Sequence, residues 1–554
     1  MYVYFWRWAI WKVFEQLEQE RAIVSFITAS SWLDGPAFVG LRQLAVDVAS
    51  DIWILDLGGE GRGPRTEDNV FDIQSPVAIV TLVRSGKAKN PARVHYRRLR
   101  GTRPEKFKQL DAITHLDATD GWTQLNVKNG EPFVPANTDE QWISYPALAD
   151  LFPWQQPGIK YNRMWPVAPS RRVLQQRWSE LLSDSDAGVR AEKYVTPASG
   201  RNIHTAVGSL PPLAKLPADA SHNEIVRMGW RSFDQQWTFD DPRLINLERP
   251  ALWQSLSDQQ LFLVTPGTMT LGTGPAITAS IGVPDLHYFR GSFGGKDVVP
   301  LYRDQEAAKP NITRGLLDLL TDRLGSSVSP EDLAAYCFAL AAHDGYTTMF
   351  WDHLEHSAVR IPLTADAELF TEAVELGRQL LWLQTGGSRF SGPDRPHLQV
   401  PRVPGIGWSE AVTAIPETTR DIRYDHKAHQ LSIGTGIVDG VRPEVWDFEV
   451  SGMNVIDRWL GARTRKGTGR AAGKSAAPLD RIRPTEWEDE WNDELLDLIR
   501  VLTVTTELAP KQKDLLERIT TGSLIKNSEL PAPRTSERNV PRTIQRGFVQ
   551  ETLL

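Results

Sequence analysis

Cysteine is the scarcest residue of this chain, and its start carries no uninterrupted apolar run. Cys337 is the single cysteine among 554 residues. One cysteine excludes an internal disulfide framework and a cysteine-based zinc site, and it predicts a reducing, cytoplasmic compartment. The apolar stretch 2–17 is broken by Arg7 and Lys12, and no small-residue cleavage site follows it. We therefore expect neither a signal peptide nor a membrane span there.

Histidines are also few and dispersed, with 11 in the whole chain. His353 and His356 stand three residues apart, as two ligands on one helix face could, but the sequence suggests no third ligand. Lone histidines more often have structural or surface roles than metal-binding ones. We expect no metal site.

The charge that is present is distributed unevenly. The composition is that of an ordinary globular protein, 41% apolar and 24% charged, with a net charge of −7. Residues 84–108 nevertheless hold ten basic residues and one acid, 154–178 hold five and none, and 458–483 hold eight and one. Such concentrations in a mildly acidic chain are typical of surfaces that neutralise nucleic-acid phosphates. Solvated loops are the alternative interpretation for each block.

The first 85 residues alternate between helical and strand patterns. Apolar residues recur at helical spacing over 2–20, and 37–48 are also helix-like. The nearly continuous apolar run 22–28 predicts a strand buried on both faces of a parallel sheet. Residues 51–57 and 77–83 predict two more strands. The pattern indicates an α/β fold of which this stretch supplies only part of a sheet.

The rest of the chain mixes short strands with longer helices. Residues 231–330 show short strands and glycine-rich turns, for example at 261–265. A helix is predicted to start at Ser329 as N-cap, followed by Pro330, and another spans about 366–384. Residues 463–478 are low in complexity and predicted to be disordered.

Eight segments spread over most of the chain carry a recognisable pattern. They are YVYFWRWAIWKVFE at 2–15, IVSFITASSWLDGPAFVGLRQL at 23–44, DIWILDLGGEGRGPRTEDNVFDIQSPVAIVTLVR at 51–84, FPWQQPGIKYNRMWPVAP at 152–169, GWRSFDQQWTFDDPRLI at 229–245, VPDLHYFRGSFGGKDVVPLYRD at 283–304, RIPLTADAELFTEAVELGRQL at 360–380 and VWDFEVSGMNVIDRWL at 445–460. The first three resemble the back half of an N6-adenine methyltransferase domain. Together they most resemble the type ISP restriction–modification enzymes, which join nuclease, translocase, methyltransferase and target-recognition domains in one chain.

The resemblance implies a fold, a partner and a cofactor. The implied fold is an α/β partial methyltransferase sheet of Rossmann-like type, followed by an α+β target-recognition domain with a helical C-terminal part. Double-stranded DNA is the implied partner, and S-adenosylmethionine is the cofactor implied for the complete enzyme. The implied limits are 1–180 for the C-terminal part of the methyltransferase domain, 181–225 for a linker, 226–460 for the target-recognition domain, 461–480 for a disordered basic loop and 481–554 for a C-terminal helical segment and tail.

The motifs of methyl transfer themselves are missing from the sequence. A flipped adenine is gripped by an amide, a proline-adjacent carbonyl and an aromatic ring, written Asn/Asp-Pro-Pro-Tyr/Phe. The nearest sequences are Asn90-Pro91-Ala92 and Leu210-Pro211-Pro212. The glycine loop 58–63 leads through 67–69 towards another strand, not into a helix, so it lacks the context of a cofactor loop. We expect no catalytic residue, and no cofactor bound by this chain alone.

The chain also departs from the family pattern at its start. In the family the Asn-Pro-Pro-Tyr motif lies just upstream of the aromatic helix that corresponds to 2–15. We expect either a truncated reading frame or a separate polypeptide that carries the nuclease, translocase and front methyltransferase parts. The sheet within residues 1–100 would then keep an open edge.

Six side chains are candidates for DNA contact, because their types suit base edges or phosphates. Three lie in a Gly-led loop that resembles the family's link into the target domain, and three lie further along; they are Lys160, Asn162 and Arg163, then Lys296, Arg303 and Asn311. Phosphate contact or a plain surface position is the alternative to base recognition for each. Arg231, Phe233 and Asp234 resemble a recurrent element of these recognition regions, where the Arg–Asp pair could instead hold the fold.

The sequence is therefore compatible with three functions. The first is a DNA-recognition module with a partial methyltransferase domain that acts only with a partner. The second is an adenine methyltransferase that becomes active when the missing half is joined in trans. The third is a mixed α/β scaffold that does not bind DNA, in which the 20 tryptophans serve packing.

Overall fold

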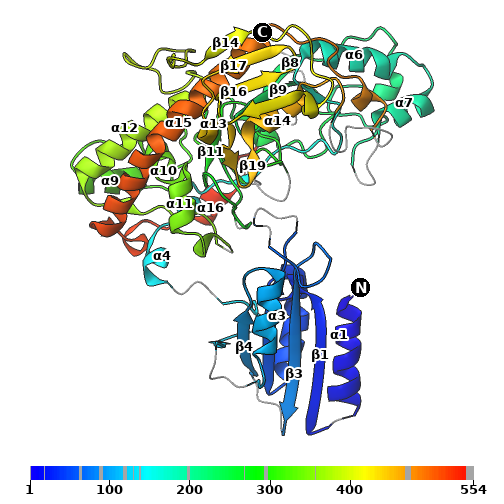
Figure 1. The fold of residues 1–554 in the computed structure, drawn as a ribbon, viewed down its shortest axis with the longest axis vertical. Coiled ribbons are helices and arrows are strands. Elements are labelled where there is room, and N and C mark those ends of the chain that lie inside the picture. The colour runs from blue at the N-terminus through cyan, green and yellow to red at the C-terminus, as the bar shows by residue number, and fades with distance from the viewer. Residues whose placement is uncertain are drawn as a thin grey trace. The chain divides into compact units, whose positions relative to one another are not determined.

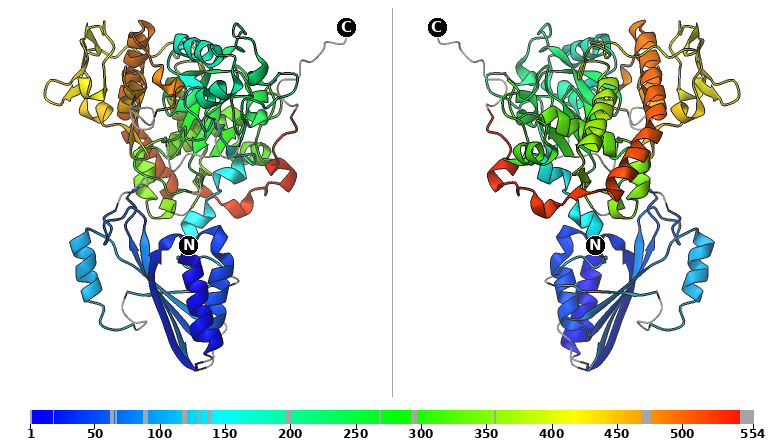
Figure 2. Two further views of the ribbon diagram at one scale, coloured as in Figure 1. Left: turned by 90° about the vertical axis from the view of Figure 1, so that its right-hand side faces the viewer. Right: turned by 90° about the vertical axis from the view of Figure 1, so that its left-hand side faces the viewer.

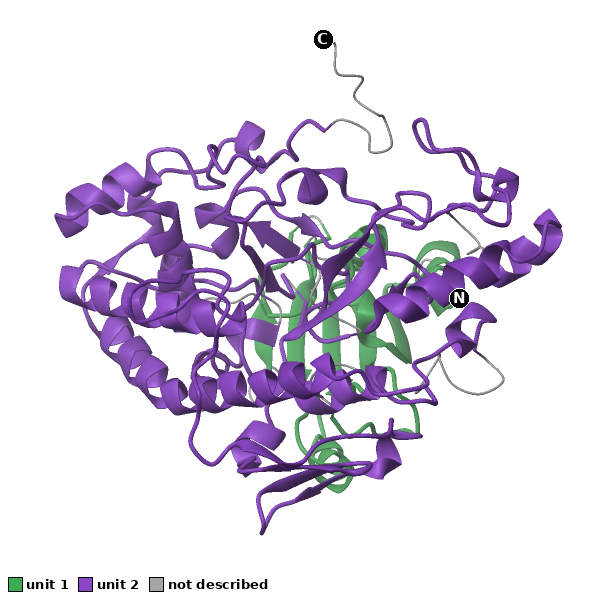
Figure 3. Cartoon of the chain, turned by 90° about the horizontal axis from the view of Figure 1, so that it is seen from above, with its two compact units in different colours: residues 1–139 green, residues 140–554 purple. Residues whose placement is uncertain are grey.

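The structure is a computed structural model of the chain, drawn as a ribbon in Figure 1. It describes residues 2–17, 19–61, 65, 67–86, 91–116, 121–128, 130–135, 139–195, 200–267, 269–291, 297–355, 357–467 and 476–543. The chain divides into two compact units, Met1–Asp139 and Glu140–Leu554, which Figure 3 shows in different colours. Within the described ranges, no helix is both long and apolar enough to cross a membrane.

The first unit is built on one five-stranded sheet with the order β1-β3-β2-β4-β5. β3 is antiparallel to β1 and β2, β4 is parallel to β2, and β5 is antiparallel to β4. The strands are β1 (Arg21–Ala29), β2 (Asp51–Gly58), β3 (Val77–Ser85), β4 (Arg93–Arg98) and β5 (Thr123–Leu125). The helices are α1 (Tyr2–Ile10), which continues as a π-helical stretch (Trp11–Gln16), α2 (Val39–Val48) and α3 (Arg103–Asp111). The predicted helices and strands of the first 85 residues are confirmed to within a few residues at their ends.

Aromatic side chains fill the core between α1 and the sheet. Trp6 and Trp32 are fully buried with ring centroids 5.0 Å apart, and Trp6 stands edge-on to Phe26 of β1 at 5.0 Å. Helical spacing places Trp6 and Ile10 on the face that packs against the sheet. Figure 2 shows α1 (dark blue) on one side of the sheet and α3 (lighter blue) on the other.

β1 differs from its prediction as a strand buried on both faces of a parallel sheet. It ends the strand order and pairs antiparallel with β3, in the register Ile23↔Val83. Val24 is buried, whereas Ile23 and Ile27 on the opposite face are 66% and 53% exposed. The prediction was wrong because a strand with apolar residues on both faces has the same sequence pattern whether or not both faces are covered.

The second unit combines several small sheets with longer helices. Its sheets have the orders β11-β10-β12-β6, β7-β9-β8 and β14-β17-β16-β15, with the pairs β13-β20 and β18-β19. The strands are β6 (Gln156–Pro157), β7 (Val167–Ala168), β8 (Ile225–Arg231), β9 (Asp234–Phe239), β10 (Phe262–Thr265), β11 (Thr278–Ser280), β12 (Asp297–Pro300), β13 (Leu363–Thr364), β14 (Gly407–Glu410), β15 (Ile422–Asp425), β16 (Gln430–Ile433), β17 (Gly436–Asp439), β18 (Glu449–Val450), β19 (Met453–Asn454) and β20 (Leu524–Ile525). The predicted strand at 261–265 is confirmed as β10.

Helices surround these sheets. They are α4 (Glu140–Ser144), α5 (Leu148–Leu151), α6 (Arg171–Leu182), α7 (Ala187–Tyr194), α8 (Pro250–Gln254), α9 (Leu316–Leu324), α10 (Pro330–Ala341), α11 (Asp344–Met349), α12 (Ala367–Gln384), α13 (Pro443–Trp446), α14 (Val455–Ala462), α15 (Glu490–Thr521) and α16 (Thr535–Arg538). The two predicted helices begin as expected. Ser329 Oγ accepts the backbone N–H of Asp332 at 3.1 Å, and Asp366 Oδ1 accepts that of Glu368 at 2.8 Å.

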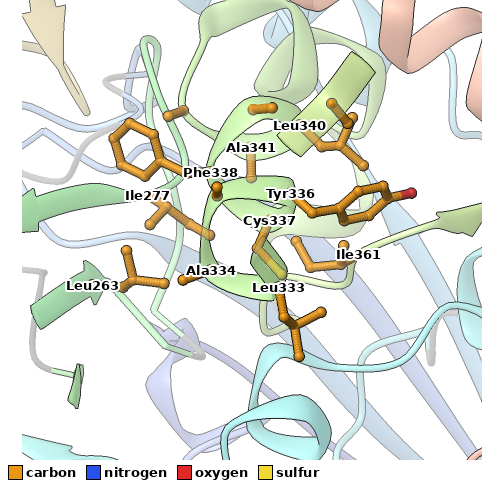
Figure 4. Packing of buried hydrophobic residues seen from close by; sticks show 14 of the residues in the cluster. Leu263, Ile277, Leu333, Ala334, Tyr336, Cys337, Phe338, Leu340, Ala341 and Ile361 are labelled. Atoms are coloured by element: carbon orange, nitrogen blue, oxygen red, sulfur yellow. The ribbon is translucent and has the colours of Figure 1, made fainter. Parts of the chain in front are cut away.

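The largest core of the second unit surrounds α10. Residues Leu333–Ala341 are all buried, and Figure 4 shows Cys337 and Tyr336 among the apolar side chains of this cluster. Gly377 of α12 lies so close to the Ala335 carbonyl that a Cβ atom at this position would overlap it. α15 joins this core to a second one, because Leu515 belongs to the first cluster and Trp491 to the second.

Candidate nucleic-acid interface

The loop after β6 positions the first three candidate side chains. Its backbone is fixed by hydrogen bonds from Lys160 N to the Leu247 carbonyl (3.0 Å) and from Asn246 N to the Lys160 carbonyl (2.8 Å). Asn162 adopts a left-handed φ of 61° and is exposed, and Lys160 is half-buried. An asparagine tolerates this backbone conformation better than most residues. The loop therefore presents the polar head groups of Lys160 and Asn162 at a fixed backbone turn.

Arg163, next in the loop, points into the protein. It is 8% exposed, and its guanidinium donates to the carbonyls of Leu244 (2.7 Å) and Arg201 (3.2 Å). The same group lies over the Tyr194 ring at 4.1 Å, and burial lowers its pKa. In this arrangement Arg163 joins three segments of the fold.

Arg303 and Asn311 contact each other; Asn311 is buried and Arg303 is partly exposed. Asn311 is 1% exposed, and its amide donates to the carbonyls of Trp154 (2.8 Å) and Pro300 (2.9 Å) while its Oδ1 accepts from Trp154 N (3.0 Å). Arg303 donates to Asn311 Oδ1 at 3.1 Å and to the carbonyls of Glu537 and Asn539. Both side chains therefore make hydrogen bonds to other groups of the protein. Lys296 lies outside the described residues, as does His356 of the histidine pair.

The basic stretch 84–108 is partly engaged within the first unit. Arg84 donates to the carbonyls of Val48 and Phe14, and the Lys106 ammonium, which is fully buried, lies 2.7 Å from Glu67. Arg93 pairs with Asp51 at 2.8 Å. A count of positive residues thus overstates the charge that this stretch offers to a ligand.

The described part of the glycine loop is occupied by protein side chains. A Cβ on Gly58 would meet the Glu67 carboxylate, and one on Gly59 would meet the Asn69 amide. Asn69 Nδ2 donates to the Gly59 carbonyl at 3.0 Å, and Gly59 N donates to Glu67 at 3.2 Å. Gly58 and Gly59 are therefore packed against Glu67 and Asn69, which lie on the segment that leads to β3.

The hairpin β8–β9 lies at a cluster of arginines. Of this cluster, Arg231 was identified from the sequence but Arg463 was not. Arg231 donates to Asp285 at 2.8 Å and lies over the Trp230 ring at 3.9 Å. Asp234 instead contacts Arg463 at 3.3 Å, so the Arg231–Asp234 pair considered from sequence does not form. Arg463 is fully buried and lies over Trp459 at 3.5 Å. No spacing in the sequence connects residue 234 with residue 463.

A cavity of about 310 Å³ opens beside this hairpin. It lies between β8–β9, α14 and the segment that follows residue 477, elements that Figure 1 shows close together. Four arginines and two carboxylates line it, together with apolar and neutral side chains; they are Arg177, Arg231, Arg458, Arg483, Asp457 and Asp480. Arginine is thus the most frequent charged residue in the lining of this cavity.

A comparison with known protein families shows to which family the second unit belongs. Residues 150–498 match the family described as type ISP C-terminal specificity domain, which is more than half of the chain. The chain belongs to this family. The match contains the Lys160 loop, the β8–β9 hairpin and the cavity, so all three are parts of a type ISP specificity domain.

Solved structures share the fold of this type ISP chain. A DrdV–DNA complex determined by cryo-EM matches with a TM-score of 0.65 and 17% identity over 94% of this chain and 52% of that chain. The ATP-dependent type ISP restriction–modification enzyme LlaBIII bound to DNA matches with 0.61 and 16% identity, over 92% and 33%. A nuclease-deletion mutant of the type ISP enzyme LlaGI with a DNA substrate mimic matches with 0.58 and 17%, over 90% and 39%. This type ISP chain spans about half of the DrdV chain and less of the other two. No curated protein matches it in sequence.

Proposed function

We propose that this chain recognises a DNA sequence as the specificity part of a type ISP restriction–modification enzyme. The observation that carries the proposal is the family match over residues 150–498, which covers three-quarters or more of the second unit's sheets and helices. The three proteins of similar fold were all determined with DNA or a DNA mimic. In this proposal the half-buried Lys160 and the exposed Asn162 contact DNA directly, and Arg163, Arg303 and Asn311 hold the segments that carry this surface.

We further propose that the first unit is part of an N6-adenine methyltransferase sheet. Two features support this: the antiparallel β3 lies between β1 and β2, and β1 ends the described strand order, so one of its edges has no partner among the described strands. A second polypeptide segment would pair with this edge and supply the base-gripping motif and the S-adenosylmethionine site. The proposed functional limits remain 1–180 for this part, of which residues 150–180 also fall within the family match, and 226–460 for target recognition, with 181–225 between them.

A binding titration tests DNA recognition. The full chain is titrated against a randomised 30-base-pair duplex at several salt concentrations, and bound duplexes are then selected and sequenced. Specific recognition predicts affinity that falls steeply with salt and the enrichment of one sequence. Affinity without salt dependence, or no binding at all, would favour the scaffold that does not bind DNA.

A methylation assay tests the partial methyltransferase. Plasmid DNA is incubated with the full chain and labelled S-adenosylmethionine, with and without a separately made polypeptide that contains the Asn-Pro-Pro-Tyr half of a type ISP methyltransferase. We expect no transfer by the chain alone. Transfer by the pair would favour the enzyme assembled in trans, and transfer by the chain alone would contradict the proposal.

A further inference from the structure

Two of the four arginines in the 310 Å³ cavity are committed to the fold. Arg177 donates to the carbonyls of Trp165 and Val167, each at 2.9 Å. Arg483 donates to the carbonyls of Thr464 and Ala462 at 3.0 Å. Asp480, which is buried, acts on both of these guanidinium groups electrostatically. This end of the cavity is therefore satisfied by protein groups.

The other two arginines meet at Gly291. The position that a Cβ atom of Gly291 would take lies 3.6 Å from the Arg458 guanidinium carbon and 3.7 Å from Arg231 Nε. Both guanidinium groups are thus within 4 Å of one point, and Gly291, with φ of 98°, places no side chain of its own between them. Arg290, the preceding residue, donates to the Ser451 carbonyl at 2.9 Å and adds a third cation nearby.

Arg458 forms no ion pair with any residue that the structure describes, although the carboxylate of Asp457 acts on it electrostatically. Arg458 is exposed, and its one described hydrogen bond goes to Met453 Sδ at 3.5 Å. Its neighbour Asp457 lines the same cavity. By contrast, Arg465 and Lys466 of the same basic block pair with Glu417 at 3.0 and 3.4 Å, and Arg231 pairs with Asp285.

Like charges so close together are unfavourable unless an anion lies between them. Although the Arg458 side chain reaches solvent, partial desolvation lowers its pKa, the charge of Arg231 lowers it further, and the carboxylate of Asp457 opposes the shift. A phosphodiester relieves this repulsion, because the planar guanidinium fork donates two hydrogen bonds to phosphate oxygens. Arg231 is already oriented by Asp285 and Trp230, so it would lose little freedom on binding.

We propose that Arg458 and Arg231, on either side of Gly291, bind one phosphate of the DNA backbone and so fix the position of the specificity domain on the duplex. This assignment rests on the proposed function, since it names a contact for the same DNA. It is a positioning contact that carries no sequence information of its own.

The test compares Arg458→Gln with the full wild-type chain on the randomised 30-base-pair duplex. One phosphate contact contributes about one unit to the slope of log affinity against log salt. We expect Arg458→Gln to lower that slope by about one and to weaken binding about tenfold at low salt. Arg458→Lys keeps the charge, so it should keep most of the slope. Arg402→Gln, at an exposed arginine outside the cavity, should change neither quantity.

Each remaining result has a defined meaning. An unchanged slope in Arg458→Gln, with wild-type binding intact, overturns the phosphate assignment and leaves the proposed function standing. Loss of binding restricted to one selected sequence assigns Arg458 to base recognition and also overturns it. Absence of salt-dependent binding in the wild-type chain refutes the proposed function instead. Thermal unfolding of each variant establishes that the comparison is made between folded proteins.

Discussion

At the scale of single residues, the side chains that bind DNA, such as arginine and asparagine, are also the ones that donate hydrogen bonds to buried backbone carbonyls. Arg163 and Asn311 were predicted to contact DNA from their chemistry and neighbourhood, and the structure places both inside the fold. Lys160 and Asn162, from the same list, remain accessible. The sequence could supply the list but not this division, because burial depends on segments distant in the chain: Arg201 lies 38 residues from Arg163, and Trp154 lies 157 residues from Asn311.

Asn311→Ala should destabilise the protein. Its amide makes hydrogen bonds to Trp154 and Pro300, and their loss leaves buried backbone groups unpaired. We expect the free energy of unfolding to fall by about 3 kcal/mol. Asn162→Gly, at an exposed position with φ of 61°, should change it by less than about 0.5 kcal/mol. Urea denaturation of both variants measures the difference, and equal stabilities would contradict the structural role of Asn311.

His343 should make stability depend on pH. Burial lowers its pKa from 6.5 to about 4, with Asp344 opposing and Lys513 reinforcing the shift. Between pH 6.5 and about 4, His343 is therefore protonated in the unfolded chain but not in the folded chain. The contribution of His343 is complete above pH 6.5 and is lost as pH falls towards 4, by up to about 3 kcal/mol.

His343→Gln removes this titration, whatever it does to stability at neutral pH. Between pH 6.5 and 4 the wild type should lose up to about 1.4 kcal/mol per pH unit more than the variant. Urea denaturation across that interval gives the two curves. Parallel curves would show that His343 is protonated in the folded protein as readily as in the unfolded one.

At the scale of elements, local signals predicted starts and types well. Ser329 with Pro330 marked the start of α10, and the alternation of patterns marked β2 and β3. The error at β1 has a different origin, since no local signal says whether a neighbouring layer covers a strand. The contact between Asp234 of β9 and Arg463, which follows α14, could not be predicted from local signals either. The two residues are 229 positions apart.

The packing of α10 against α12 requires a residue without a side chain at position 377. Helix propensity alone predicts that Gly377→Ala stabilises α12 by about 1 kcal/mol. The Ala335 carbonyl occupies the space that the new Cβ needs, so we expect a net destabilisation of about 2 kcal/mol or more. Gly461→Ala in α14 has only an ordinary contact with Thr419, at 3.8 Å, and should be neutral or stabilising. Thermal unfolding separates the two, and a stabilised Gly377→Ala would mean that the helices can move apart.

At the scale of the whole molecule, the two units have separate interiors. The core clusters of Met1–Asp139 draw on residues between Trp6 and Phe133, and those of the second unit begin at Trp142. The family match at 150–498 lies entirely within the second unit. Length indicated several domains, but the division at residue 139 was not predicted, although the segment 128–140 (KNGEPFVPANTDE) contains Gly130, Pro132 and Pro135.

The fragment 140–554 should therefore fold alone and retain the sequence preference of the full chain. Its cores need no residue of the first unit, and the proposed contacts at Lys160, Asn162 and Arg458 all lie within it. We expect calorimetry of the full chain to show two transitions, one of them at the temperature found for the fragment. Selection from the randomised duplex should enrich the same sequence with both proteins. A fragment that folds but enriches nothing would place part of the recognition surface on residues 1–139, where Arg84, Arg93 and Lys106 are already engaged within the unit. The remaining basic residues of 84–108 would then be the first positions to substitute.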